Sequence, residues 1–242
     1  YYVGEGSRRS AEKDFRNTGG AGFRRLMAAG DLVRLATDPV YDPPPDPVPP
    51  NHHWVGTLIW EPVKESPAWL KEPGNPWVLM TLSSARQDGE IELARAAVAA
   101  AAEFPVRLLV TLADGKSADD LRSTSDKVRV EAFVPHSRVL ESARLCIAHA
   151  GHGIVAKALQ FGVPMVLVPW DRDQPGVAAR AEALGAAKVV PRSELSPESL
   201  TGAIREVLGT ASYGESARLH GERIRNYDPA ALVCEKIEAF LR

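Results

Sequence analysis

Cysteine is scarce in this 242-residue sequence, which contains only Cys146 and Cys234. Both lie in apolar surroundings without the spacing of a metal site, so we expect buried free thiols in a reducing compartment and no bound metal. No signal peptide is recognisable, and no apolar run approaches the roughly 20 residues of a membrane span. The sequence therefore predicts a cytoplasmic protein with no transmembrane segment.

An excess of positive charge is also lacking, because 29 Lys and Arg residues face 31 Asp and Glu residues. This balance disfavours a nucleic acid as partner. Neither GxGxxG after a first strand nor GxxxxGK[ST] is present, which disfavours a dinucleotide-dependent dehydrogenase and a P-loop ATPase. The chain begins with YYVGEG and has no initiator methionine, so we expect a piece of a longer protein.

Proline is abundant in one stretch, DPVYDPPPDPVPP at 38–50, which predicts a stiff, extended connector. The segment before it contains a strand-like run at 31–37 but is too short to form its own core, so it must dock elsewhere. We therefore divide the chain into an arm (1–37), a proline-rich linker (38–53) and one large domain (54–242).

Within the large domain, apolar runs alternate regularly with helical patterns. Strands are expected over 76–82, 106–112, 127–134, 145–150, 163–169 and 186–190. Helices are expected over 90–103, 117–123, 153–161 and 175–184, from Pro197 onward, and near 212–224 and 229–241, with Gly162 ending one of them. Because the strand runs do not alternate with polar residues, they predict a doubly wound parallel α/β sheet with helices on both faces.

Ligands of such sheets bind beyond the carboxyl ends of the strands. Four polar or glycine-rich stretches follow predicted strands: SSARQ (83–87), FVPHS (133–137), HAGHG (149–153) and PWDRDQP (169–175). In HAGHG, Gly151 and Gly153 would let a ligand approach the backbone, and the helix that follows offers free N–H groups to an anion. This pattern predicts a phosphate or similar anion beside His149.

The series FVPHSRVL, HAGHG, GVPMVLVP and DQP resembles the nucleotide-sugar-dependent glycosyltransferases of the GT-B fold, which include UDP-glucuronosyltransferases and bacterial natural-product glycosyltransferases. The resemblance covers about residues 54–242 and corresponds to their C-terminal, Rossmann-like donor-binding half. It implies a UDP- or TDP-sugar as co-substrate, no separate cofactor, and sugar transfer to an acceptor hydroxyl, with inversion.

The resemblance further implies that the acceptor, a small molecule or a lipid, is bound by an N-terminal half whose main body is absent here. The catalytic base of the family is a histidine of that half, so no catalytic residue is expected in this chain. His52 and His53 lie near the end of the connector, and we expect them to be solvated loop residues.

The resemblance assigns the donor diphosphate to His149, together with the backbone of Gly151, His152 and Gly153. It also places Ser83 and Ser84 near the phosphates. Taken without the resemblance, His149 could be a hydrogen-bonded core histidine, and serines after a strand are common turn residues.

The nucleotide base is assigned to Phe133, Val134 and His136, and the transferred sugar to Trp170, Asp173 and Gln174. Three of these residues have simpler explanations. Phe133 could be an ordinary core residue, His136 could be solvated at a helix start, and Asp173 could be an N-cap.

Two residues depart from the family pattern. Ile154 stands where a Ser or Thr usually meets a phosphate, and Lys157 stands where a Glu usually holds the ribose hydroxyls. We expect Lys157 to contact the phosphates or the ribose instead. The departures keep open a non-catalytic nucleotide-binding or partner protein on the same fold, and a sugar-nucleotide epimerase is a less favoured alternative.

Overall fold

A parallel six-stranded sheet forms the centre of the computed structural model, which describes residues 31–62, 64–82, 89–112, 121 and 125–241. The strands are β3 (Trp77–Thr81), β4 (Arg107–Thr111), β5 (Val128–Glu131), β6 (Ala143–Ala148), β7 (Met165–Leu167) and β8 (Ala187–Val189). Their order is β5-β4-β3-β6-β7-β8 and every neighbouring pair is parallel. The winding direction reverses between β3 and β6, and this topological switch point is where such sheets bind ligands.

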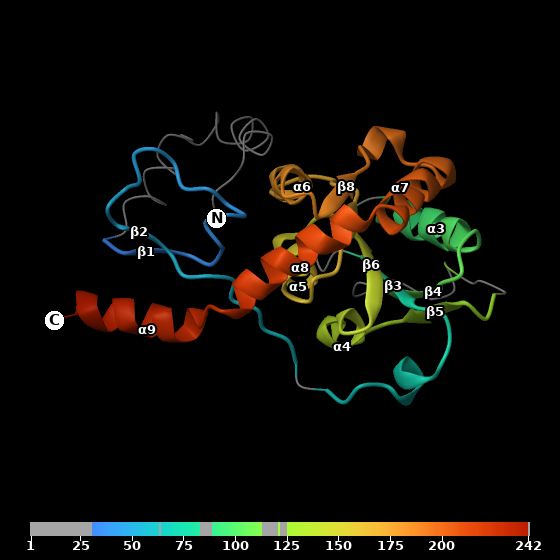
Figure 1. The fold of residues 1–242 in the computed structure, drawn as a ribbon, viewed down its shortest axis with the longest axis horizontal. Coiled ribbons are helices and arrows are strands. Elements are labelled where there is room, and N and C mark those ends of the chain that lie inside the picture. Colours follow the sequence, from blue (N-terminus) through green and yellow to red (C-terminus); the bar gives the residue numbers. More distant parts are fainter. Residues whose placement is uncertain (1–30, 63, 83–88, 113–120, 122–124, 242) are drawn as a thin grey trace.

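Helices cover both faces of the sheet (Figure 1). They are α3 (Glu90–Ala101), α4 (His136–Leu140), α5 (His152–Gln160), α6 (Gln174–Ala183), α7 (Pro197–Gly209), α8 (Ala211–Arg225) and α9 (Pro229–Phe240). Alternate residues of β3 point to opposite sides, because Leu79 packs in the core shared with α4, α5, α6 and α8, whereas Val78 and Met80 pack with α3 and α7. The predicted doubly wound α/β fold is therefore confirmed.

Two predicted helix boundaries have the expected local chemistry. Gly162 follows α5 with a left-handed φ of 68°, and the N–H groups of Gly162 and Val163 donate to the carbonyls of Leu159 and Ala158, as in a Schellman motif. Ser196 caps α7, since its side chain accepts from the N–H of Ser199 at 3.1 Å. The predicted helix at 117–123 lies almost wholly outside the described residues.

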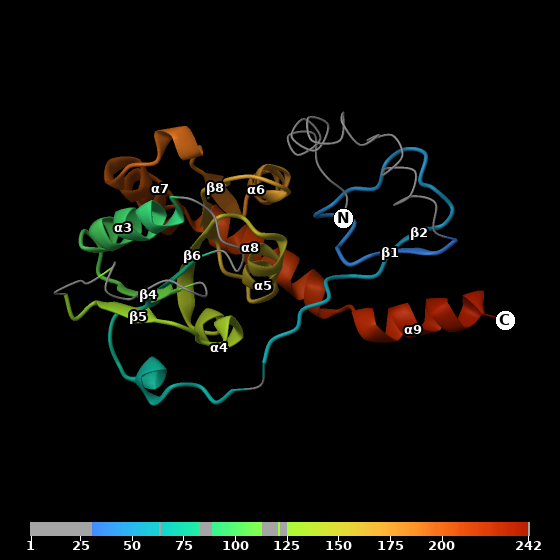
Figure 2. The same ribbon diagram turned by 180° about the vertical axis from the view of Figure 1, so that it is seen from behind.

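A small second sheet stands apart from the six strands, on the same side as α9 (Figures 1 and 2). It consists of β1 (Val33–Leu35) and β2 (His52–Trp54), which pair in parallel. The prediction that His52 and His53 are solvated loop residues was wrong. Both are half-buried and lie in β2, which forms a strand because its backbone pairs with that of β1.

The start of the connector is packed against the body of the domain. Asp38 is only 1% exposed, and its carboxylate accepts two hydrogen bonds from the guanidinium of Arg223 on α8. The Tyr41 hydroxyl donates to the carbonyl of Val177 on α6 at 2.9 Å, and Arg180 of the same helix lies 3.4 Å from Asp42. The chain before the large domain is thus held close to the carboxyl edge of the sheet.

The two thiols differ in their surroundings. Cys146 is buried in β6, and burial raises the pKa of its thiol to about 12. Cys234 is exposed on α9, so the prediction that both cysteines are buried was wrong for this one. Over the part of the chain that the structure describes, no helix has both the length and the apolar character to cross a membrane.

Candidate functional site

Three of the four predicted loops meet beyond the carboxyl edge of the sheet. The loop after β6 leads into α5, the loop after β7 leads into α6, and residues 132–135 connect β5 to α4. β6 borders the switch point, so its loop lies at the usual ligand position of a doubly wound sheet. Ser83 and Ser84 of the fourth loop lie outside the described residues.

The two glycines at the start of α5 have room beside them for a side chain. A Cβ atom added at Gly151 or at Gly153 would meet no heavy atom of the described residues within 4 Å. Gly151 has a φ of −60° and caps the helix in an extended conformation that any residue can adopt. Within the part of the chain that the structure describes, neither backbone strain nor internal packing requires glycine at these two positions, which suits the close approach of a ligand to the backbone.

Backbone strain occurs beside the site instead. Ala150 and Arg172 have φ values of 65° and 63°, and they are the non-glycine residues with positive φ in the described part of the chain. Ala150 directly follows His149, and Arg172 directly precedes Asp173. Strain of this kind persists where surrounding structure enforces it and is common at ligand sites.

His149 lies at the end of β6 and is 3% exposed. Its Nε2 atom lies 3.5 Å from Oε2 of Glu90, the first residue of α3, whose side chain is 0% exposed. The edge of the imidazole also meets the ring of Trp170, with 4.9 Å between the ring centroids. Sequence analysis missed Glu90, because an acidic residue in the first turn of a helix is usually a solvated one.

The His152 side chain turns toward the arm and connector. Its Nε2 donates to the carbonyl of Ala36 at 3.3 Å, its ring centroid lies 6.2 Å from that of Tyr41, and burial lowers the pKa of its imidazole. What His152 offers at the start of α5 is its backbone N–H, which is the group that the sequence-based prediction assigned to phosphate.

Asp173 and Gln174 begin α6 at the end of the neighbouring loop. Asp173 occupies the N-cap position, yet its side chain makes no capping hydrogen bond, so capping does not account for its carboxylate. The Gln174 side chain is buried, and its Oε1 accepts from the N–H groups of Trp170 and Asp171 at 2.8 and 3.2 Å. Gln174 therefore braces the loop through its side-chain oxygen.

At the end of β5, Phe133 is 47% exposed and Val134 is buried. Phe133 is thus not a core residue, and the Lys64 ammonium lies 4.5 Å from the centroid of its ring. His136 is not solvated either, since its Nε2 lies 2.9 Å from the hydroxyl of Thr111. Burial, and then the charge of Lys157, lower the pKa of His136 to about 4, so its ring is neutral at pH 7.

Lys157 is held by a carboxylate that follows the connector. Its Nζ donates to Oε1 of Glu61 at 2.7 Å, and both side chains are 14% exposed. Glu61 also accepts from the backbone N–H groups of His136 and Ser137 at 2.8 and 3.1 Å. Burial alone would raise the pKa of Glu61, but Lys157 and Ser137 lower it to about 2.

Ile154, the other residue that departs from the family pattern, packs against the hydrophobic core.

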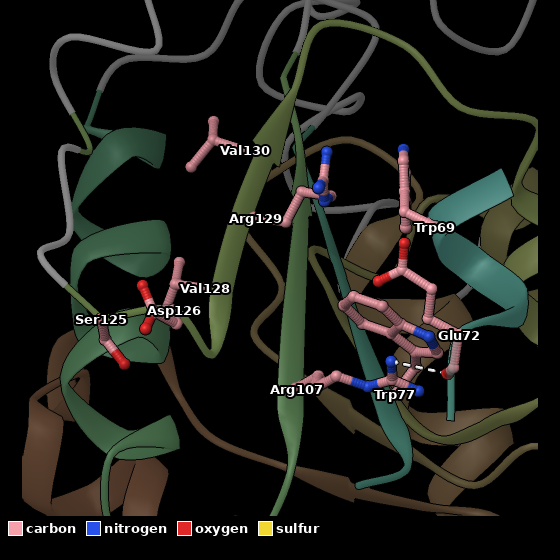
Figure 3. A pocket seen from close by; sticks show the side chains of 9 residues that line it. All are labelled: Trp69, Glu72, Trp77, Arg107, Ser125, Asp126, Val128, Arg129 and Val130. Carbon is pink, nitrogen blue, oxygen red and sulfur yellow. Dashed lines mark hydrogen bonds between the residues drawn. The ribbon is translucent and has the colours of Figure 1, made fainter. Parts of the chain in front are cut away.

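A cavity of about 490 Å³ lies at the opposite, amino edge of the sheet (Figure 3). The first residues of β3, β4 and β5 line it, together with Trp69 and other residues. The guanidinium of Arg107 lies 4.2 Å from the ring centroid of Trp77, and that of Arg129 lies 4.3 Å from the ring centroid of Trp69. Because this cavity is on the far side from the loops above, it is separate from the candidate site.

These features define a doubly wound α/β domain with a candidate ligand site at the switch point of its sheet. The chain belongs to the family described as erythromycin biosynthesis protein CIII-like, C-terminal domain, which matches residues 95–240. The fold is accordingly that of the C-terminal, Rossmann-like half of GT-B glycosyltransferases, as the sequence predicted.

Individual relatives agree with this assignment. The chain is 32% identical over 208 residues to 4'-demethylrebeccamycin synthase of Lentzea aerocolonigenes, covering 84% of this chain and 48% of that protein. It is 32% identical over 190 residues to UDP-glucuronosyltransferase 2C1 of Oryctolagus cuniculus, covering 74% and 37%. The chain thus spans half or less of the length of these curated relatives.

A solved structure extends the likeness to three dimensions. Spinosyn rhamnosyltransferase SpnG complexed with thymidine diphosphate superposes with a TM-score of 0.73 at 25% identity, covering 86% of this chain and 56% of that one. Within the described residues, no group of three His, Cys, Asp or Glu side chains is arranged to hold a metal ion.

Proposed function

We propose that this chain is the donor-binding half of a glycosyltransferase that transfers a sugar from a UDP- or TDP-sugar to an acceptor hydroxyl, with inversion. One observation carries the proposal: a buried histidine and two glycines with open space beside them mark a helix N-terminus at the switch point. Family membership and the thymidine diphosphate in the SpnG complex support a nucleoside diphosphate as the ligand.

In this proposal the diphosphate binds His149 and the N–H groups at the start of α5, with Ser83 and Ser84 nearby. Phe133, Val134 and His136 receive the base, and a neutral His136 suits an uncharged base edge. Trp170, the Asp173 carboxylate and the Gln174 NH₂ group receive the sugar. The ammonium of Lys157, fixed by Glu61, contacts the phosphates or the ribose.

The contribution of this half to the reaction is electrostatic. Negative charge grows on the departing diphosphate as the glycosidic bond breaks, and His149 and the N-terminus of α5 are placed to stabilise it. The base that deprotonates the acceptor, and the surface that binds the acceptor, come from the N-terminal half in this proposal. The 242-residue chain alone should therefore bind nucleotide and turn over poorly.

A thermal-shift titration with UDP, TDP, ADP and GDP tests the proposal. A ligand at ~100 times its Kd adds about 2.7 kcal/mol of stability, or roughly 5–10 °C in a chain of this size. We expect this shift with a pyrimidine diphosphate, its loss in His149→Ala, and its retention in the control His53→Ala on the remote strand β2. No shift with any of the four nucleotides would contradict the proposed site.

A further inference from the structure

We propose that Glu90 is a positioning residue that keeps the His149 ring doubly protonated and oriented toward the diphosphate. The inference rests on the proposed function, because it explains how the same histidine binds an anion. Glu90 is the fully buried carboxylate described above, and its Oε2 lies 3.5 Å from Nε2 of His149.

The first step concerns the charge of Glu90. A carboxylate removed from water needs a compensating positive charge or a proton. Glu90 is the first residue of α3, where the helix dipole favours a negative charge, and the imidazole of His149 lies within ion-pair distance. Both neighbours favour an ionised Glu90, so the proton of the pair belongs on the ring.

The second step concerns the ring nitrogens. A neutral imidazole has one N–H donor, and if that donor faces Glu90 the other nitrogen, Nδ1, is an acceptor that repels a phosphate oxygen. A doubly protonated ring carries an N–H on both nitrogens, so that Nε2–H faces the Glu90 carboxylate and Nδ1–H can donate to the ligand. The charge of Glu90 thus converts His149 from a mismatched partner of phosphate into a charge-assisted donor.

Two positive charges near the ring work against its protonation. Arg192 lies 4.7 Å from the ring centroid of Trp170, which packs against His149, and the N-terminus of α5 follows His149 in the chain. Both are positive. Asp171 and Asp173 are carboxylates in the loop that carries Trp170, and Glu90 is the carboxylate within ion-pair distance of the His149 ring, so we assign to Glu90 the stabilisation of the imidazolium. Replacing Glu90 by the neutral isostere glutamine should leave the ring neutral near pH 7.

The direct test is nitrogen NMR of the histidine rings, with the His149 signal assigned by its absence in His149→Gln. In the wild-type chain we expect imidazolium shifts for His149 up to about pH 7.5, where a free imidazole is largely neutral. Glu90→Gln should show a neutral ring at that pH, and Glu92→Gln, an exposed acid two residues further along α3, should match wild type. A neutral ring in the wild-type chain would overturn the inference without any variant.

The functional test is the affinity for UDP and TDP by calorimetry, expressed as the ratio of variant to wild type at each pH so that titration of the ligand cancels. Glu90→Gln should bind the nucleotide about tenfold or more weakly than wild type near pH 7.5. The loss of affinity should be much smaller near pH 5.5, where the His149 ring is protonated in the variant as well as in the wild type. Glu90→Asp should recover part of the loss.

The outcomes separate the two proposals. A loss in Glu90→Gln that does not change with pH would make Glu90 merely structural and overturn the inference, while nucleotide binding by the wild type upheld the proposed function. Absence of nucleotide binding by the wild type would contradict the proposed function, and the NMR titration would still decide whether Glu90 sets the charge of His149.

Discussion

Replacing Gly153 by alanine should make the protein more stable and, at the same time, weaken nucleotide binding. Gly153 is the second residue of α5, and an added Cβ meets no heavy atom of the described residues within 4 Å. Alanine lowers the entropy of the unfolded chain and favours the helix, which should add about 0.5–1 kcal/mol to the free energy of unfolding. In a chain of this size that is roughly 1–4 °C in Tm.

The same methyl group would occupy the space where we place the diphosphate. A displaced phosphate loses charge-assisted hydrogen bonds, and one such bond of about 1.5 kcal/mol corresponds to a roughly tenfold rise in Kd. Thermal unfolding and calorimetry with UDP and TDP, on one preparation of the variant, measure the two effects independently. Opposite changes in stability and affinity are the signature of a glycine kept for a ligand.

Gly202 provides the matched control, because it lies within α7, is exposed, and has equally open space beside it. Gly202→Ala should raise Tm by a similar amount and leave the affinity unchanged. If Gly153→Ala binds nucleotide as well as Gly202→Ala does, no ligand atom occupies this space. A Tm below wild type would instead refute the description of the space as open.

Two further predictions concern stability. The pKa of Glu61 is lowered from its ordinary value of 4.5 to about 2 in the folded chain. Its charge therefore stabilises the fold above about pH 4.5, and this stabilisation is lost as the pH falls toward 2. Glu61→Gln should thus lower the free energy of unfolding by roughly 1–2 kcal/mol at neutral pH, allowing for partial exposure, and by less in acid. Denaturant titrations across this pH range measure the difference from wild type, with the exposed Glu65→Gln as control. A difference that does not change with pH would disprove the prediction. Gly162→Ala should lower the free energy of unfolding by about 1–3 kcal/mol, because φ is 68° and the new Cβ would lie 2.9 Å from Cγ of Arg218. An unchanged midpoint in denaturant would contradict it.

The sequence was sufficient to predict the main sheet because its signals are local. Continuous apolar runs predict strands buried on both faces, and capping residues such as Ser196 act within a few positions of the helix they start. The small sheet was harder. β2 follows a proline-rich stretch and contains His52, His53 and Trp54, and it forms a strand only because β1 supplies a partner 19 positions earlier.

The candidate site divides in the same way. The loop residues that follow strands, such as His149 and Asp173, could be predicted from their position at the carboxyl edge. Glu61 and Glu90 could not, because the importance of each carboxylate depends on a partner that the fold brings close. Glu61 meets Lys157 across 96 positions, and Glu90 meets a histidine 59 positions away. No spacing rule on a single sequence signals pairs of this kind.

The contacts of the arm and connector bear on where the binding half begins. We keep the division into arm, linker and domain as a proposal about the sequence, yet packing crosses both boundaries. The Ala36 carbonyl accepts from His152 at the start of α5, Asp38 is buried against Arg223, and Tyr41 reaches α6. Since α5 and α6 carry the proposed phosphate and sugar contacts, residues 36–42 support the site structurally. A movement of the segment that precedes the domain would therefore first displace the N-termini of α5 and α6.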